Sequence, residues 1–313
     1  MAPAPTLGQR RASSEHRPIE ADDIEISKML SWPNLQWAKE NDMTTTTTDR
    51  PLALITGASS GIGYELARQF AADGYDLFLT ATEQSSLERS ANEVSASGAR
   101  VEIFSADLTD YDGVERLYAA LRATGRPLAA AVLNAGVGLG GYFVGGTALA
   151  DELRMIQLNA VSQVHLTKLI VPDMVARGAG KLLYTASISG TMPTPYEAVY
   201  GATKAFLISF AEAVKSEIKD SGVSITLLLP GQVDTNFWPR SGMVDNKLAV
   251  GEKASPVKVA QEGYAAFKKG EDRVVAGMVS SKLIGNVVNN LAPDTVKADL
   301  HAREAKPGSG LKE

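Results

Sequence analysis

The sequence contains no cysteine among its 313 residues. The chain therefore cannot form disulfides, use a thiolate nucleophile or bind a metal through cysteine. Histidine is also rare, and the three histidines lie far apart in the chain without a metal-ligand spacing: His16, His165 and His301. We therefore expect no metal site.

Long apolar runs and blocks of one charge are missing as well. No run approaches the ~18 apolar residues of a membrane-spanning helix, and no secretory hydrophobic region precedes the first strand. The formal net charge is −5 without a basic block, which argues against nucleic acid as a main partner. We expect a cytoplasmic protein. With 44% hydrophobic and 21% charged residues, it has the composition of a globular chain with a sizeable core.

Amino-acid composition and hydrophobic periodicity divide the chain into three parts. Residues 1–48 show no hydrophobic period and end in a run of threonines, which predicts a disordered N-terminal extension. Alternatively, the natural start is Met43, at the beginning of that run. Residues 49–292 are expected to form a single catalytic domain, and residues 293–313 a polar C-terminal tail.

Within the central part, short apolar runs alternate with helical patterns. This alternation predicts right-handed βαβ units and an α/β fold, a Rossmann-type doubly wound parallel sheet of about seven strands with helices on both faces. Ligands bind such sheets at the carboxyl ends of the strands. The expected strands are residues 52–55, 76–80, 101–105, 128–133, 181–186, 223–229 and 273–276.

A glycine-rich turn follows the first strand and leads into a helical pattern. Its glycines allow backbone amides to approach a pyrophosphate, and the helix N-terminus adds a favourable field. The spacing differs from the common G-x-G-x-x-G fingerprint. The candidate cofactor-binding residues of this turn are Thr56, Gly57, Ser59, Ser60, Gly61, Ile62 and Gly63.

Further cofactor candidates follow the other strands. Thr82 occupies the position at which NAD-binding proteins carry an acidic residue that hydrogen-bonds to the ribose. The absence of that acid favours NADP over NAD, although the position also lacks an arginine that would bind the 2′-phosphate of NADP. Asp107 could accept from an adenine amino group or simply form a turn. The remaining candidates are Leu108, Asn134, Ala135, Gly136, Pro230, Gly231, Val233 and Thr235.

Tyr200 and Lys204 lie four residues apart in a predicted helix, hence on one face. An ammonium near a phenol favours the phenolate and lowers its pKa, which suits a proton donor or acceptor. Ser187 follows the fifth predicted strand and can face the same reacting oxygen. Taken alone, a Tyr–Lys pair at this spacing is more often an ordinary helical pair. The surrounding motifs favour a catalytic role for it here.

Other candidates depend on weaker signals. Asn159 lies in the long helical stretch 149–176, where an amide can disturb the helix and hold a water, or be a satisfied polar group. Segment 236–243 could be a mobile lid or a surface loop. Apolar side chains after the fourth and sixth strands could line a substrate pocket or merely pack: Leu139, Tyr142, Phe143, Phe237, Trp238 and Met243.

Together these motifs resemble the short-chain dehydrogenase/reductase family over residues 50–280. The matching pieces, in family order, are Thr56-Gly57-x-x-x-Gly61-Ile62-Gly63, Asp107-Leu108, Asn134-Ala135-Gly136, Asn159, Ser187, Tyr200-x-x-x-Lys204 and Pro230-Gly231. The chain departs from the family pattern at Leu133, often Asn, and at Thr82, often Arg in NADP-preferring members.

The resemblance implies an NAD(P)-dependent oxidoreductase that transfers hydride between nicotinamide and a carbonyl or alcohol substrate. It implies that Tyr200 is the acid/base, that Ser187 polarises the carbonyl and that Asn159 holds a relay water. Lys204 would lower the Tyr200 pKa and hold the nicotinamide ribose. Val233 and Thr235 would contact the carboxamide.

Other readings of the same motifs stay open. One is a family member that uses the bound cofactor for isomerisation or elimination, and another is a non-catalytic NADP-binding regulator. The expected partner is a small, hydrophobic carbonyl or alcohol compound, and the resemblance implies a homodimer or homotetramer.

Overall fold

The computed structural model describes residues 50–311, and the predicted N-terminal extension lies outside this range. The described chain forms a parallel sheet of seven strands in the order β3-β2-β1-β4-β5-β6-β7. Its two halves diverge from β1 and β4, which are neighbours, and this confirms the doubly wound fold. The strands are β1 (Leu52–Thr56), β2 (Asp76–Ala81), β3 (Val101–Ser105), β4 (Leu128–Leu133), β5 (Gly180–Thr185), β6 (Val223–Pro230) and β7 (Arg273–Ala276).

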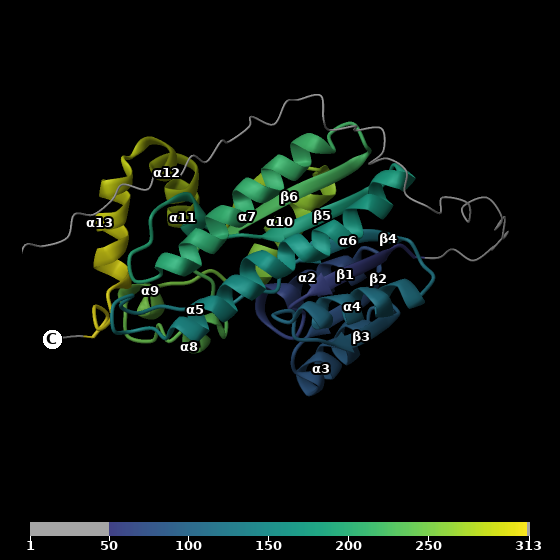
Figure 1. Cartoon of the computed structure of the whole chain (residues 1–313), viewed down its shortest axis with the longest axis horizontal. Helices are drawn as coiled ribbons and strands as arrows, with labels where there is room; N and C mark the ends of the chain where they lie inside the picture. Colours follow the sequence, from purple (N-terminus) through teal and green to yellow (C-terminus); the bar gives the residue numbers. More distant parts are fainter. Residues whose placement is uncertain (1–49, 312–313) are drawn as a thin grey trace, which may run out of the picture. The chain divides into compact units, whose positions relative to one another are not determined.

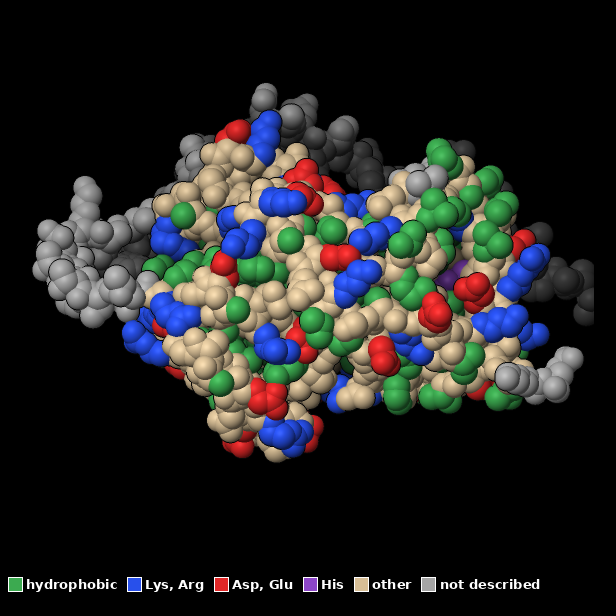
Figure 2. Space-filling model, turned by 180° about the vertical axis from the view of Figure 1, so that it is seen from behind, with side chains coloured by type: hydrophobic (Ala, Val, Ile, Leu, Met, Phe, Trp, Pro, Cys, Tyr) green, Lys and Arg blue, Asp and Glu red, His purple; other side chains and the backbone are tan. Residues whose placement is uncertain are grey.

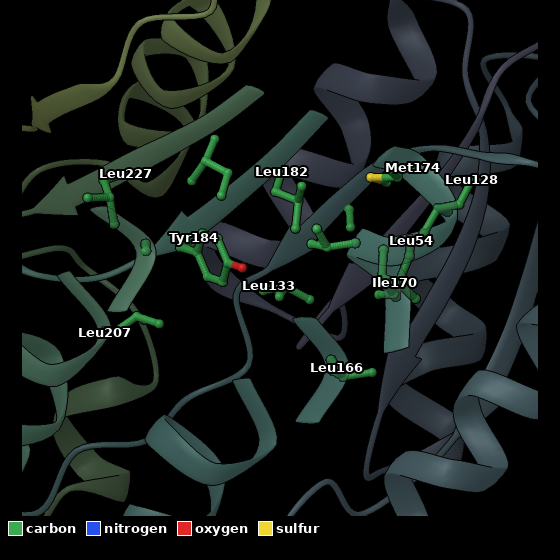
Figure 3. Close-up of a cluster of buried hydrophobic side chains, with 14 of the residues drawn as sticks. Leu54, Leu128, Leu133, Leu166, Ile170, Met174, Leu182, Tyr184, Leu207 and Leu227 are labelled. Atoms are coloured by element: carbon green, nitrogen blue, oxygen red, sulfur yellow. The ribbon is translucent and has the colours of Figure 1, made fainter. Parts of the chain in front are cut away.

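Alternate side chains of each strand enter two separate cores. In β1, Leu52 and Leu54 join one cluster, whereas Ala53 and Ile55 join the other, as the two-residue period of a strand requires. One core is covered by α4 (Tyr111–Ala123), α6 (Ser162–Arg177) and α7 (Ala198–Glu217), and the other by α2 (Gly61–Ala72), α3 (Gln84–Ser95) and α10 (Pro256–Lys269). Figure 3 shows side chains of the first core, among them Ile170 of α6 and Leu54 of β1.

Local signals fix where several helices begin and end. At the start of α10 the Ser255 hydroxyl accepts from the Val257 amide at 3.2 Å, and Pro256 occupies the first turn. Gly270 ends the helix at φ +70°. The predicted ranges of β3, β4 and β7 are confirmed to the residue. Those of β1, β2 and β6 stop one residue short, and β5 begins and ends one residue before its predicted range.

The chain after β6 forms a group of short helices at one end of the sheet (Figure 1). We call this group the C-terminal cover: α8 (Phe237–Arg240), α9 (Lys247–Val250), α11 (Val279–Leu283), the π-turn η5 (Ile284–Val288), α12 (Asn289–Leu291) and α13 (Asp294–Ala305). The cover has a small core of its own, in which Trp238, Met243, Leu248 and Ala305 are buried together. The polar tail expected from residue 293 therefore includes a helix that packs on the domain.

Hydrophobic side chains are exposed on part of this cover. Figure 2 shows green side chains gathered at the end of the molecule that carries α11 to α13. The exposed residues there include Val279, Leu283, Leu291, Val296 and Leu300. Within residues 50–311, no helix combines the length and hydrophobicity that crossing a bilayer requires.

Candidate active site

A cavity of about 920 Å³ opens at the carboxyl edge of the sheet. It runs along the ends of β1, β2, β4, β5 and β6 and is closed on the far side by residues of the C-terminal cover. Nearly all the sequence candidates meet here, although they come from distant parts of the chain. The cavity therefore joins the expected cofactor-binding residues to Ser187, Tyr200 and Lys204.

The glycine-rich turn forms one end of this cavity. Gly57 and Gly61 adopt φ +67° and +59°, a left-handed conformation that other residues adopt only with strain. A side chain at Gly63 would place its Cβ 2.3 Å from the carbonyl oxygen of Gly57. The turn consequently tolerates only glycine at these positions, and it leaves the N-terminus of α2 open to an anionic ligand.

Two polar residues support this turn from below. The Oγ1 of Thr56 accepts from the backbone amides of Asn134 and Ala135, both at 2.9 Å. The Asn134 side chain donates to the Thr56 carbonyl at 3.1 Å. Thr56 is fully buried and does not line the cavity, so it holds β1 and β4 together beneath the site. All the other predicted cofactor-binding residues line it.

Asp107 lies in the cavity wall beside an arginine that the sequence did not point to. Its Oδ2 accepts from Arg154 at 2.6 Å, and its Oδ1 accepts from the amide and hydroxyl of Thr109 at 3.0 and 2.7 Å. Burial raises the pKa of Asp107, but these hydrogen bonds outweigh burial and hold the pKa below its ordinary value. The Asp107 carboxylate is therefore ionised at neutral pH. It stabilises the turn at Thr109 and is also available to a ligand in the cavity.

Ser187, Tyr200 and Lys204 meet in the centre of the cavity. The Ser187 hydroxyl hydrogen-bonds to Tyr200, and Ser187 also caps the short 3-10 helix η4 (Ile188–Thr191). Burial raises the pKa of Tyr200, the Glu197 carboxylate raises it further and the bond to Ser187 lowers it. The phenol is thus protonated at neutral pH.

Lys204 lies one helical turn beyond Tyr200, with its Nζ 5.8 Å from the centre of the Tyr200 ring. The Nζ donates to the Thr185 carbonyl at 2.9 Å, and burial lowers the pKa of Lys204 to about 8. Lys204 is not among the groups that set the Tyr200 pKa in this structure, so its lowering effect stays a prediction.

Asn159 occupies a break in the regular helix. The helical stretch divides into α5 (Leu149–Ile156), the π-turn η3 (Gln157–Val161) and α6, and such turns often mark functional sites. The Asn159 amide bonds to both backbone groups of Val137, accepting at 2.9 Å and donating at 2.8 Å. The side chain thereby fixes the loop after β4 against the helix.

The apolar candidates divide into two groups. Phe237 and Trp238 line the cavity, and the Phe237 ring lies 5.4 Å from that of Tyr200. Leu139 and Phe143 do not line it, and the Phe143 side chain is exposed. Neither Leu139 nor Phe143 therefore belongs to the wall of this cavity. Met243, also outside the lining, packs in the small core of the cover.

Several cavity residues escaped the sequence reasoning. Glu197, Asn289, Lys297 and His301 are buried and line the wall opposite the glycine-rich turn. Lys297 and His301 lie in the segment from residue 293 whose polar composition suggested a tail, and Asn289 lies just before it. No motif links these three residues to Glu197. Among these missed residues, only Glu197 had a sequence signal, because it lies three residues before Tyr200.

The residues present fit a nicotinamide dinucleotide. The glycines of the turn present no side chains that would block a pyrophosphate. Gly136 lines the cavity beside Asn159 and Lys204, where an added Cβ would lie only 3.1 Å from the Asn159 Oδ1 and 3.3 Å from the Lys204 Nζ. The volume is at the upper end of the ~300–1,000 Å³ of small-molecule sites. Among the described residues, no group of three or more His, Asp or Glu side chains could hold a metal ion.

Comparison with known proteins gives the same family. The sequence model of the short chain dehydrogenases matches residues 51–243. Ketoacyl reductase HetN of Nostoc sp. is 29% identical over 234 residues, covering 74% of this chain and 79% of that protein. Sulfoacetaldehyde reductase 2 of Chromohalobacter salexigens is 34% identical over 187 residues, covering 59% and 74%.

Among solved structures, a short-chain dehydrogenase from Sphingobium yanoikuyae in complex with NADPH superposes with a TM-score of 0.66. The two sequences are 30% identical, and the match covers 72% of this chain and 87% of the Sphingobium chain. With the fold, the cavity and these likenesses in agreement, the chain belongs to the short-chain dehydrogenase family, oxidoreductases that transfer hydride between NAD(P) and a carbonyl or alcohol.

Proposed function

We propose that this protein is an NADP-dependent carbonyl reductase in which Tyr200 gives the proton to the substrate oxygen. The observation that carries the proposal is that Ser187, Tyr200 and Lys204 share one cavity with the turn Gly57–Gly63. The buried Tyr200 phenol stays protonated at neutral pH, which suits a proton donor and hence the reductive direction.

In this mechanism the bound nicotinamide supplies the hydride. Ser187 and Tyr200 hold the carbonyl oxygen between their two hydroxyls, which polarises the carbonyl and fixes its position. Tyr200 then gives its proton to that oxygen as negative charge develops there. Lys204 holds the nicotinamide ribose, and its charge stabilises the phenolate that is left. Asn159 keeps the loop after β4 in place and the relay water next to Lys204.

The preference for NADP rests on two features of the adenosine end. Thr82 stands at the end of β2 where a carboxylate would repel a 2′-phosphate. Arg240 of α8 lines the same cavity as Thr82. The hydroxyls of Ser86 and Ser85 lower the pKa of the neighbouring Glu83, and Arg240 acts in the same direction, which puts its charge near this end. Arg240 therefore replaces the arginine missing at position 82.

The substrate is proposed to be largely apolar. Besides Phe237 and Trp238, the cavity is lined by Ile284, Val288 and Leu300 of the cover. The Phe237 ring lies beside Tyr200, and this apolar lining suits a hydrocarbon chain or ring. The two relatives named as reductases of a ketoacyl group and of an aldehyde are consistent with carbonyl reduction.

We further propose a homodimer or homotetramer formed through α5 and α7, and a cytoplasmic location. Apolar side chains are exposed on this side of the domain, including Leu153 and Phe206. Covering them with a second copy would remove apolar area from water.

The test is oxidation of NADPH and of NADH against a panel of aldehydes and ketones, with products identified by chromatography. We expect turnover with NADPH that falls by at least about a hundredfold in Tyr200→Phe, while NADPH binding is retained. Full activity of that variant would refute the role of Tyr200. An isomerised or dehydrated product without net NADPH oxidation would favour the alternative use of the cofactor.

A further inference from the structure

Four buried polar side chains form one wall of the substrate cavity. Glu197, Asn289, Lys297 and His301 are only 4%, 6%, 7% and 7% exposed, and all of them line the cavity. We call these four residues the polar wall. Buried ionisable side chains are unusual unless they are paired or bind something. The proposed mechanism uses none of them.

Two hydrogen bonds pair the residues of the polar wall, and α13 carries one member of each pair. Lys297 and His301 are four residues apart in α13 and therefore on one face of it. The Nε2 of His301 lies 3.0 Å from Oε2 of Glu197, and the Nζ of Lys297 donates to the Asn289 carbonyl at 3.1 Å. The cluster thus ties the C-terminal cover to the first turn of the Tyr200 helix.

The backbone before Glu197 is held in an unusual conformation. Tyr196 adopts φ +67° and is the non-glycine residue with positive φ in the described chain. Such a conformation costs about 1–3 kcal/mol and persists where the surroundings enforce it. Here it turns the chain into α7 and directs the Glu197 carboxylate toward His301, less than one turn from Tyr200. The cluster is therefore built close to the reacting oxygen.

The Asn289 side chain has an unmet hydrogen-bond acceptor. Its Nδ2 donates to Oγ1 of Thr191 at 2.6 Å, and that hydroxyl has already given its proton to the Ile188 carbonyl at 2.7 Å. The Asn289 amide must therefore donate to Thr191, which leaves its Oδ1 as the free end. This oxygen is buried and finds no partner among the described residues. An unmet buried acceptor costs roughly 1–3 kcal/mol, which a ligand donor would restore.

Lys297 offers the complementary group beside it. Two of its three ammonium protons go to the Asn289 carbonyl and to Asp294 Oδ1, at 3.1 and 2.6 Å. One proton is left for the cavity that Lys297 lines. The polar wall therefore contains an unmet acceptor on Asn289 and a donor proton on Lys297, two residues that are in contact through the Asn289 backbone carbonyl.

We propose that the polar wall binds a hydroxyl group of the substrate, so that the natural substrate is a carbonyl compound that carries a hydroxyl on an otherwise apolar skeleton. A hydroxyl both donates and accepts, and so it satisfies Asn289 and Lys297 together. A carboxylate has no proton for Asn289, and an ammonium group has no acceptor for Lys297. This inference rests on the proposed reductase function and names its substrate class.

The test compares octan-2-one with a series of its derivatives in which one hydroxyl is moved along the chain. Values of kcat/KM are measured with NADPH and the full-length protein. In parallel, octan-2-ol and the matching octanediols are titrated calorimetrically into the enzyme with NADPH, a pair that cannot react. We expect at least one hydroxylated compound to exceed its parent about tenfold or more in both measurements.

Variants separate recognition from a structural role. Asn289→Leu and Lys297→Met should bring the ratio between hydroxylated and parent compounds toward one, and Asn289→Leu still tests the idea if Lys297→Met fails to fold. Asp299→Asn changes an exposed charge of α13 outside the cavity lining and should keep the ratio.

The two readouts also separate this inference from the proposed reductase activity. If no hydroxylated compound exceeds its parent in binding or in turnover, the inference is overturned even when every ketone is reduced. A preference in binding without any ketone reduction supports the polar wall and counts against the reductase.

Discussion

The ammonium group of Lys204 donates a hydrogen bond of 2.9 Å to the carbonyl oxygen of Thr185 at the end of β5. This contact joins the Tyr200 helix to the strand that precedes Ser187, and Lys204 is buried there. Because burial disfavours the charged form, the pKa of Lys204 falls to about 8. The depressed pKa makes the stability of the protein depend on pH.

The first prediction concerns the pH dependence of stability in Lys204→Met. Between about pH 8 and 10 the folded wild type has lost the Lys204 proton and the unfolded chain retains it, so folding stability rises with pH. One such group contributes at most about 1.4 kcal/mol per pH unit. We expect the free energy of unfolding of the wild type to rise relative to that of Lys204→Met across this window. Parallel curves from urea unfolding would show that the Lys204 pKa is not depressed.

The second prediction concerns Asp76, a buried carboxylate at the start of β2. It is fully buried, its Oδ2 pairs with Arg126 at 3.0 Å and its Oδ1 accepts from the Arg100 amide at 2.9 Å. Asp76→Ala would leave the Arg126 charge without its partner in a poorly solvated place, so we expect a loss of about 3–5 kcal/mol in unfolding free energy.

A matched surface pair provides the control. Arg122 and Asp173 form an ion pair at 2.5 Å, with both side chains almost half exposed. Asp173→Ala should cost at most about 1 kcal/mol. Urea titration of both variants measures the difference, and equal losses would contradict the special role of Asp76. Because Asp76 lies at the edge of the sheet opposite the cavity, KM for NADPH should stay unchanged.

The third prediction tests Arg240 as the reader of the 2′-phosphate. In Arg240→Ala we expect KM for NADPH to rise about tenfold, the effect of one charge-assisted hydrogen bond, and KM for NADH to change little. The control is Arg273→Ala, which removes an exposed cation at the opposite, amino-terminal end of β7. Equal effects of Arg240→Ala on both cofactors would mean that it does not recognise the phosphate.

The sequence predicted the sheet and the centre of the site well, because both depend on local patterns. The short apolar runs between helical patterns predicted all seven strands. The motif around Ser187 and Tyr200 follows a strand whose end the parallel topology brings to the same edge as the other motifs. These residues needed no knowledge of distant contacts. The glycine-rich turn was equally clear, since its conformation depends on residues adjacent in the chain.

What the sequence missed depends on contacts between distant segments. His301 and Glu197 are separated by 104 residues, and no local pattern links them. The polar face of α13 looked like a solvated tail because buried and exposed charges have the same sequence pattern. Phe143 failed as a pocket residue for the same reason, since only the fold decides which way a loop side chain points.

The last prediction concerns assembly through α5 and α7. Leu153 and Phe206 are 52% and 45% exposed, and they come from helices that pack against each other. If a second copy covers them, the double variant Leu153→Glu, Phe206→Glu would bury two carboxylates without partners. Each costs several kcal/mol, so the assembly should dissociate to monomers in light scattering. Val144→Glu, at an 89% exposed loop position, should keep the wild-type mass. A wild type that is already monomeric at micromolar concentration would contradict the proposed assembly.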